Sequence, residues 1–406
     1  MDVMHTSCAI SGGGPAGMML ALLLARNGID VVVLEKHADF FRDFRGDTIH
    51  PSTIGVLGEL GLRDAFLGLP HTSIRTLDAV VDGTRLHPID FGRLRPPDDF
   101  LVLAPQWDFL TFIAGEAQRS GDFHLLMETE ATGLIWEDGV VRGLTAEGPH
   151  GLVRIEADLT IAADGRDSIL RAAAGLRPRR YGVPIDVLWF RLPKPEAVPP
   201  STLAYIGHGA MVVTIDRGDY FQTGLVIPKG GIDQLREAGL AVFRTTVATA
   251  APFLAEPLES ITDWDQVKLL SVQIDHLDRW YRRGFLAIGD AAHAMSPAFG
   301  VGVNYAVQDA VATANAVAGP LRSGPVDLRV LDGIQRRRLP PAQWMQRIQL
   351  AAHRGITRPG GAALLPNPLP PLAGAALAAA TPIAQRVTAR LVGRGLRPES
   401  VDPSLR

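Results

Sequence analysis

The sequence predicts an α/β protein: a Rossmann-type nucleotide-binding domain into which an antiparallel sheet is inserted, followed by C-terminal helices. Three observations support this fold class. A strand–turn–helix–strand unit with a glycine-rich turn opens the chain. Runs typical of strands then dominate residues 181–275. A buried strand, a second glycine-rich turn and a helix of small residues return at 284–317.

The composition excludes several classes of protein. The chain has 406 residues, and its net charge of -3 provides no basic field for nucleic acid. A single cysteine, Cys8, excludes an internal disulfide and favours a reducing compartment, which predicts a cytoplasmic protein. No run of about 18 uncharged apolar residues appears, so no membrane span is expected. The sequence predicts no metal site.

The first unit has the spacing of a dinucleotide fingerprint. A short strand at 6–11 leads into Gly-Gly-Gly-Pro-Ala-Gly at 12–17, then an apolar helix and a second strand at 29–34. Glycines at this spacing allow a tight turn and bring a pyrophosphate close to the helix N-terminus. Glu35, followed by Lys36, ends the second strand and can accept hydrogen bonds from a ribose. The alternative is a glycine-rich structural turn.

The later unit predicts the rest of a ligand site. A strand at 285–288 ends in Gly289 and Asp290, and Gly300 and Gly302 let the backbone approach something flat and large. The following helix, from Asn304, offers free N–H groups and the positive end of its dipole. These features suit a ligand that carries hydroxyls and gains negative charge on reduction, as a flavin does.

Two further positions are candidates for ligand contact. A strand at 154–161 leads to Asp164 and Gly165, at the mouth of the predicted sheet. A simple turn, with Asp167 or Ser168 capping the next helix, is the alternative. Arg45 is a candidate for phosphate contact, and a solvated surface arginine is the alternative interpretation.

The chain divides into three expected parts. Residues 1–75, 100–180 and 276–330 form the nucleotide-binding domain, residues 76–99 and 181–275 the inserted sheet, and residues 331–406 a helical region. A single helix at 232–248 covers the inserted sheet. Trp189, Met211 and Tyr220 of this sheet are candidates to line a substrate pocket, and a role in the core is the alternative for each, because only one sheet face can meet a ligand. In the helical region, the arginines at 336–338 are interpreted as a solvated helix face.

Three stretches in this order carry a resemblance to a known family. The glycine motif at 12–17 with Glu35, the Ala-Asp-Gly at 163–165, and the Gly-Asp-Ala-Ala-His run from Gly289 through Pro297 to Asn304 are together similar to class A (single-component) FAD-dependent aromatic hydroxylases. The similarity covers about residues 6–320, and the family has a para-hydroxybenzoate hydroxylase-like fold. Ser11 departs from the family, which usually has an apolar strand residue there.

The resemblance implies the cofactor, the chemistry and the binding residues. It implies FAD, reduced by NADPH or NADH, and molecular oxygen that reaches an aromatic substrate through a flavin C4a-hydroperoxide. The mixed apolar pocket expected in the inserted sheet suits a planar, polycyclic aromatic compound of the kind found in natural-product pathways. The residues that the resemblance implies for FAD are Gly12, Gly14, Pro15, Ala16, Gly17, Glu35, Lys36, Arg45, Gln106, Asp164, Gly165, Gly289, Asp290, Pro297, Gly300, Gly302, Val303 and Asn304.

The pocket and the chemistry of the substrate stay open at this point. Phe299 stands where the family often has a small residue and could reshape the pocket beside the flavin. His208, Tyr205 and Tyr220 lie in the right part of the chain to activate a phenol, but turn or core roles are the more frequent ones, so no catalytic residue is assigned. His293 is interpreted as structural, and a homodimer is expected only because dimers are common.

Three rival functions are weighed. A flavin halogenase is disfavoured because its Trp-x-Trp-x-Ile-Pro signature is absent. A reductase of the same fold would act on a quinone or an isoprenoid without inserting oxygen. A flavin-bearing binding protein would recognise a planar ligand without turnover.

Overall fold

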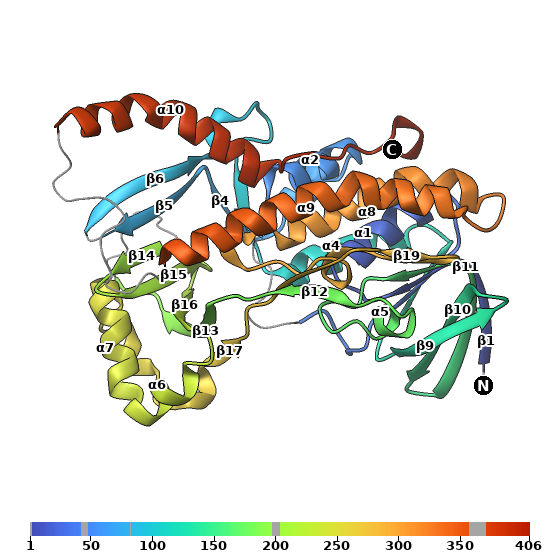
Figure 1. The fold of residues 1–406 in the computed structure, drawn as a ribbon, viewed down its shortest axis with the longest axis horizontal. Helices are drawn as coiled ribbons and strands as arrows, with labels where there is room; N and C mark the ends of the chain where they lie inside the picture. The colour runs from blue at the N-terminus through green and yellow to red at the C-terminus, as the bar shows by residue number, and fades with distance from the viewer. Residues whose placement is uncertain (1, 42–47, 82, 197–203, 357–370) are drawn as a thin grey trace.

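The computed structural model describes residues 2–41, 48–81, 83–196, 204–356 and 371–406. The two larger sheets lie side by side, and the long helix α9 (Leu328–Ile356) runs along both of them (Figure 1). The α/β fold class expected from the sequence is confirmed. Within the described residues, none of the helices combines the length and the apolar character that crossing a bilayer requires.

The first sheet has eight strands around a parallel core. The order β19-β20-β11-β1-β2-β8 is extended by β10 on β11 and β9 on β10. Val31–Leu34 is buried at every position, as expected for a strand covered on both faces. The strands are β1 (Asp2–Ser11), β2 (Val31–Leu34), β8 (Phe123–Leu126), β9 (Glu130–Glu137), β10 (Val140–Gly148), β11 (Gly151–Ala162), β19 (Tyr281–Arg282) and β20 (Phe285–Ala287).

The register of the parallel strands brings their carboxyl ends to one edge. Ser11, the last residue of β1, pairs with Leu34 of β2 and with Ala162 of β11. Ala162 in turn pairs with Ala287, the last residue of β20. The turns that follow these four strands therefore emerge together, which is where open α/β sheets bind ligands.

Helices cover the faces of this sheet. Helix α1 is buried along nearly its whole length and packs against α8 and α4. An all-round apolar helix of this kind belongs in the interior of a large domain. The helices and smaller elements here are α1 (Pro15–Ala25), α2 (Pro51–Glu59), α3 (Arg63–Leu67), α4 (Gln106–Gln118), α5 (Ile169–Ala173) and α8 (Gly302–Leu321), with a small sheet of β3 (Thr48–Ile49), β7 (Leu101–Leu103) and β4 (Thr72–Ile74).

The second sheet has seven mostly antiparallel strands in the order β17-β13-β16-β15-β14-β5-β6. The short pair β12 (Pro178–Tyr181) and β18 (Ile274–Leu277) lies where the chain enters β13 and where it leaves β17. Its strands are β5 (Thr76–Val81), β6 (Thr84–Asp90), β13 (Ile185–Pro193), β14 (Ala204–Gly207), β15 (Ala210–Asp216), β16 (Tyr220–Pro228) and β17 (Lys268–Leu270).

The two faces of the second sheet have different covers. Leu188 and Phe190 of β13 pack with residues of α6 (Ile232–Ala238) and α7 (Leu240–Ala250), whereas Val187 and Trp189 face the opposite way. The prediction of one helix at 232–248 is wrong, because Gly239 interrupts it with φ of 93°. A positive φ is open to glycine and breaks the helical hydrogen-bond pattern.

Two long helices near the C-terminus pack against elements of both parts of the fold. Helix α9 (Leu328–Ile356) lies along α8, and α10 (Pro371–Gly393) lies over β6 (Figure 1). The interpretation of residues 336–338 as a solvated face is wrong for Arg338, which is 1% exposed. Arg338 lies on the side of α9 that packs onto α8, where Asp309 accepts a hydrogen bond from it.

Candidate active site

The turn after β1 is shaped by its glycines. Gly12 has φ of 109°, and a Cβ on it would lie well under 3.0 Å from the carbonyl oxygen of Ala163. A Cβ on Gly17 would collide in the same way with the carbonyl oxygen of Gly12. Gly14 differs, because a Cβ on it would meet no described atom within 4 Å. Gly12 and Gly17 therefore serve internal packing, while Gly14 leaves one side of the turn open.

The open side of this turn is the N-terminus of α1. Gly14 is the N-cap residue and Pro15 the first helical residue, and no described side chain caps the helix. Its first N–H groups have no partner within the helix, and the dipole makes this end positive. Ala16 packs against Gly289 from the later motif. The two motifs separated by more than 270 residues of sequence thus meet directly.

Glu35 lies beside the glycine turn. Its Oε2 accepts a hydrogen bond from Gly13 N at 3.1 Å, and its Oε1 accepts one from His37 N at 3.1 Å. The residue is only 8% exposed, so its carboxylate is held in a fixed place at the end of β2. Lys36 forms an exposed ion pair with Glu130 at 3.4 Å. Lys36 is therefore not drawn into the site by any described contact.

Asp164 and Gly165 follow β11 at the same edge of the sheet. Asp164 Oδ2 accepts a hydrogen bond from Leu170 N at 3.3 Å, and burial raises the pKa of this carboxyl. Its Oδ1 is buried and has no hydrogen-bond partner among the described residues. The predicted cap is present: Ser168 Oγ accepts a hydrogen bond from Arg171 N at 3.0 Å. Asp164 is therefore free on one oxygen and anchored on the other.

Arg171 joins two of the motifs, although no sequence pattern pointed to it. Its Nη1 donates to the carbonyl oxygen of Ala291 at 3.1 Å, and its Nη2 donates to that of Arg166 at 2.5 Å. Asp275 lies 3.9 Å from Nη1, and Arg171 is 5% exposed. A buried guanidinium on the helix after Asp164 thus ties the segment that contains Asp164 to the one that contains Asp290.

Asp290 is the accessible acid of the later motif. Its Oδ2 lies 3.2 Å from Arg166 Nε, and about a third of each side chain is exposed. Gly289, with φ of 59°, precedes it and donates its N–H to Asp309 Oδ2 at 3.1 Å. Asp309 also pairs with His293, at 2.5 Å, and with Arg338. Burial alone would raise the pKa of Asp309, but His293 and Arg338 outweigh it and lower that pKa.

Thr48 and His50 contact the loop that links Asp290 to α8. Thr48 Oγ1 donates to the carbonyl oxygen of Gly300 at 2.9 Å, and His50 Nε2 lies 3.1 Å from the same oxygen. Gly300 has φ of 63°, and Phe299 has φ of 67°, a conformation that non-glycine residues rarely adopt. Strain of this kind persists only where the surroundings enforce it, and it clusters at ligand sites.

Helix α8 begins directly after this loop. No described side chain caps it, and a Cβ on Gly302 would point into open space. Asn304 is fully buried, and its Oδ1 accepts hydrogen bonds from Ser52 and Thr53 of α2. Asn304 therefore fixes the helix start against α2, a contact that differs from the ligand contact implied by the resemblance. Pro297 lies in the loop before α8, and Val303 is the second residue of the helix.

Polar side chains of α9 contact the loop between Asp290 and α8 as well. Gln349 Nε2 donates to the carbonyl oxygens of Ser296 and Ala298, at 2.9 Å each. Gln346 Nε2 donates to that of Ala294, and His353 Nε2 lies 2.9 Å from Ser296 Oγ. These residues were not predicted from the sequence. The signal was available, because polar residues recur at helical spacing among the apolar ones of α9.

His50 gives the site a testable pH dependence. Burial lowers the pKa of His50 to about 4, below the 6.5 of an exposed histidine. Between these values the unfolded chain binds a proton that the folded protein does not, so stability falls as pH drops from about 6.5 to 4. The full effect is about 3 kcal/mol. Urea unfolding of wild type and of His50→Gln across this range should show a shallower loss in the variant.

His276 and His353 also have lowered pKa values, through burial, and remain in both proteins of this comparison. The difference between wild type and His50→Gln therefore isolates His50. Equal slopes for the two proteins would show that His50 is not held neutral in the folded state.

The predicted substrate residues lie on or beside one sheet face. Trp189 belongs to the same apolar cluster as Met295 and Val301, and Phe299 packs against that cluster. Met211 lies on β15 at the same alternation as Val213, which packs against the cluster as well. Tyr220 starts β16 on the same face, with Arg191 over its ring at 5.1 Å. Tyr205 belongs to the opposite face and packs on Phe253.

Gln106 and Arg45 are two further residues that the resemblance implied for FAD. Gln106 is the first residue of α4 and is half-buried. Arg45 lies outside the described residues.

The arrangement of the described residues suits an FAD molecule. Two uncapped helix N-termini, of α1 and α8, stand at the same edge of the sheet, beside glycines with open space. A buried carboxylate oxygen of Asp164 and a partly exposed carboxylate of Asp290 lie in the turns between them. Helix N-termini bind phosphate and stabilise developing negative charge, and carboxylates bind hydroxyls.

Comparison with known proteins gives the family. The FAD binding domain family matches residues 5–348. A 6-methylpretetramide 4-monooxygenase from Streptomyces rimosus is 32% identical over 364 residues, covering 88% of this chain and 86% of that protein. A kynurenine 3-monooxygenase from Stenotrophomonas maltophilia is 27% identical over 344 residues, covering 76% of this chain and 71% of that protein.

A solved structure agrees at the level of the fold. The anhydrotetracycline hydroxylase OxyS from Streptomyces rimosus superposes with a TM-score of 0.74 at 21% identity, covering 96% of this chain and 76% of that one. The family match, the relative at 32% identity and the convergence of the three motifs lead to the same conclusion. The chain belongs to the class A FAD-dependent aromatic hydroxylases, and it is an FAD-dependent monooxygenase of that type.

Proposed function

We propose that the protein uses NADH or NADPH and molecular oxygen to hydroxylate a planar, polycyclic aromatic compound. The observation that carries this proposal is the apolar face of the seven-stranded sheet around Trp189, which packs toward the loop that contains Phe299. A broad apolar face beside the flavin site suits a flat, fused-ring substrate. The relative whose name specifies 6-methylpretetramide, and the hydroxylase named for anhydrotetracycline, support this class.

The proposed assignment of the cofactor residues follows the geometry. The N-terminus of α1, with Gly12, Gly14 and Gly17, would hold the pyrophosphate, and Glu35 the adenosine ribose. Asp290 would bind the ribityl chain, and the segment from Gly300 to Asn304 would border the flavin ring. The remaining proposed contacts are Pro15, Ala16, Lys36, Arg45, Gln106, Asp164, Gly165, Gly289, Pro297 and Val303.

The protein's own part in the reaction is positioning. The chemistry that bound FAD would supply is hydride transfer from the nicotinamide and activation of oxygen. The N–H groups at the start of α8 would stabilise negative charge beside them. The apolar cluster around Trp189 and Phe299 would exclude water and orient the substrate. A homodimer and a cytoplasmic location stay predictions, the first from frequency alone and the second from the lone, buried Cys8.

The test measures NADH or NADPH oxidation together with oxygen uptake by the FAD-loaded protein. The aromatic probes are phenol, 1-naphthol and 1,8-dihydroxyanthraquinone. We expect the anthraquinone to accelerate both rates most and to gain one oxygen atom by mass. Acceleration only by phenol would refute the polycyclic class. Nicotinamide oxidation without oxygen in any product, under all three probes, would contradict the proposed reaction on this substrate class.

A conservative change at Trp189 should weaken substrate binding selectively. The indole lies over Gly224, and a Cβ on Gly224 would sit 3.0 Å from the ring. Trp189→Phe keeps an aromatic ring but loses contact area, so we expect 1,8-dihydroxyanthraquinone to bind about fivefold more weakly, a loss of about 1 kcal/mol. FAD content should be unchanged. Titration of the flavin absorbance with the probe measures this.

The matched control for Trp189→Phe is Trp136→Phe, on the exposed surface of β9, where the tryptophan is 43% exposed. Equal effects of the two substitutions would show that Trp189 does not contact the substrate.

A further inference from the structure

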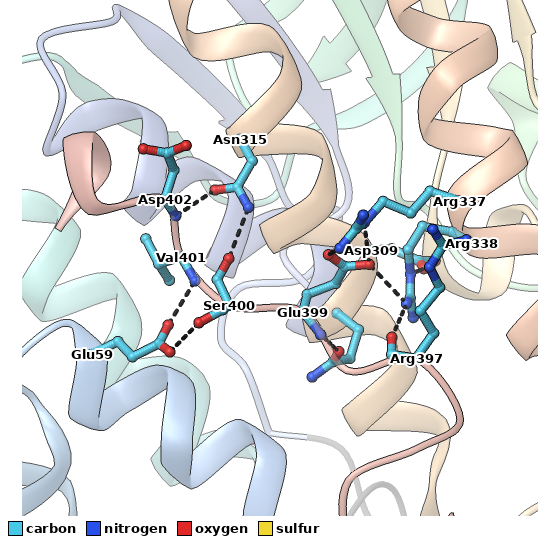
Figure 2. Close-up of polar contacts among 11 residues, drawn as sticks. Glu59, Asp309, Asn315, Arg337, Arg338, Arg397, Glu399, Ser400, Val401 and Asp402 are labelled. Carbon is cyan, nitrogen blue, oxygen red and sulfur yellow. Dashed lines mark hydrogen bonds and ion pairs between the residues drawn. The ribbon is translucent and has the colours of Figure 1, made fainter.

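The C-terminal segment 397–402 makes polar contacts with residues of α2, α8 and α9 (Figure 2). Glu399 lies at its centre, and its side chain is 1% exposed. Arg337 Nε donates to both carboxylate oxygens at 2.7 Å, and Arg338 Nη1 donates to Oε1 at 3.3 Å. The Glu399 N–H donates to Gln308 of α8. A segment that follows the last helix thus places a buried acid between α8 and α9.

Arg338 connects Glu399 to Asp309 of α8. Its Nη1 also donates to the carbonyl oxygen of Arg397 at 3.0 Å, so two residues of the C-terminal segment fix one end of the guanidinium. At the other end, Nε donates to Asp309 Oδ1 at 2.9 Å. Both Arg338 and Asp309 are 1% exposed or less. Ionised groups this deeply buried depend on one another for solvation, so the position of one constrains the position of the next.

The second carboxylate oxygen of Asp309 binds the turn assigned to the flavin. Oδ2 accepts the N–H of Gly289 at 3.1 Å and pairs with His293 at 2.5 Å. Gly289 precedes Asp290 and packs against Ala16 at the start of α1. A shift of Asp309 would therefore move the turn that presents Asp290 and rests on the helix assigned to the pyrophosphate.

We propose that Glu399 is a positioning residue for the FAD site: through Arg338 it fixes Asp309, and Asp309 fixes the Gly289–Asp290 turn. The family match ends at residue 348, so Glu399 lies outside the matched region. Arg338 also lies over the ring of Tyr305, at 5.9 Å, and Tyr305 belongs to the apolar cluster around Trp189. The relay from Glu399 to Gly289 does not run through Tyr305, and the inference concerns FAD retention. It rests on the proposed placement of the ribityl chain at Asp290.

The same segment supplies a matched control. Glu59 of α2 accepts hydrogen bonds from Ser400 Oγ and, at 2.6 Å, from Val401 N (Figure 2). It therefore anchors the segment about as directly as Glu399 does. None of the described contacts of Glu59 leads to Asp309. Glu59→Gln and Glu399→Gln make the same chemical change in two residues that anchor one segment. Only Glu399 is connected, through Arg338 and Asp309, to the Gly289–Asp290 turn.

The experiment measures FAD affinity and local exchange in the full-length protein. Fluorescence of released FAD gives the dissociation constant, and hydrogen–deuterium exchange by mass spectrometry follows peptides that cover residues 285–296. We expect Glu399→Gln to weaken FAD binding about 5- to 10-fold and to speed exchange in these peptides. Glu59→Gln should change the affinity less than twofold and leave these peptides protected, even if it loosens residues 400–406.

Equal effects of the two variants on FAD affinity and exchange would overturn the proposal, because they would indicate general stabilisation by the segment. If Glu399→Gln fails to fold, Arg337→Met is measured instead. Arg337 is 46% exposed, so its loss is tolerated, yet it removes the two 2.7 Å contacts that hold the carboxylate of Glu399. A wild-type FAD affinity and wild-type exchange in Arg337→Met would also overturn the proposal.

Faster exchange at 285–296 with unchanged FAD affinity would separate the two inferences. It would support the relay from Glu399 to the Gly289–Asp290 turn and contradict the placement of the ribityl chain at Asp290. Weaker FAD binding without faster exchange would contradict the relay itself.

Discussion

Gly17→Ala is expected to abolish FAD binding and to destabilise the protein by about 3 kcal/mol or more. A Cβ at this position would lie well under 3.0 Å from the carbonyl oxygen of Gly12, and it would also press on Ile10 of β1 at 3.1 Å. Backbone on both sides is fixed by the sheet and by α1, so neither can retreat cheaply. Flavin absorbance after gel filtration and urea unfolding measure the two effects.

Gly14→Ala is the informative control for this prediction. Its Cβ meets no described atom within 4 Å, and its φ of -78° is open to any residue. The fold should therefore keep its stability within about 0.5 kcal/mol. If the pyrophosphate lies against this turn, FAD affinity should still fall at least tenfold, because the methyl group occupies the approach. Unchanged FAD affinity in Gly14→Ala would contradict the placement of the pyrophosphate here.

Arg171→Met is expected to destabilise the protein by about 3–5 kcal/mol. The substitution removes the cross-link to the carbonyl oxygens of Ala291 and Arg166 and leaves the buried Asp275 without the cation 3.9 Å away. Burial already raises the pKa of Asp275, and Arg171 is the first group that opposes this. Urea unfolding, and the FAD content of the purified variant, should both show the loss.

Arg166→Met is the control for this second prediction. Arg166 lies five residues earlier and makes a partly exposed ion pair with Asp290 at 3.2 Å. A contact of this kind contributes about 0–1 kcal/mol to folding, so Arg166→Met should unfold close to wild type. Similar destabilisation by both substitutions would show that the burial of Arg171 is not what makes it important.

The cofactor motifs could be predicted because they depend on local backbone requirements. Gly12 and Gly17 are needed wherever a strand turns sharply into a helix against a neighbouring strand, whatever the rest of the fold. The alternation of β13 likewise places Trp189 and Phe190 on opposite faces. Which of the two faces packs against residues 295–301 is not a local property. It depends on the packing of α7 on one face and of residues 295–301 on the other.

The sequence by itself determined the fold class and the glycine-rich turns, since these follow from short-range patterns, and it indicated the family through its resemblance to known aromatic hydroxylases. The tertiary structure decided which side chains hold those motifs in place. Thr48 and His50 meet Gly300 from about 250 positions away, and Glu399 reaches Asp309 through Arg338. An arginine in a charge run has the same local sequence whether it is solvated or buried. Only the face on which α9 packs against α8 removes Arg338 from water, because burial depends on contacts between segments that are distant in the chain.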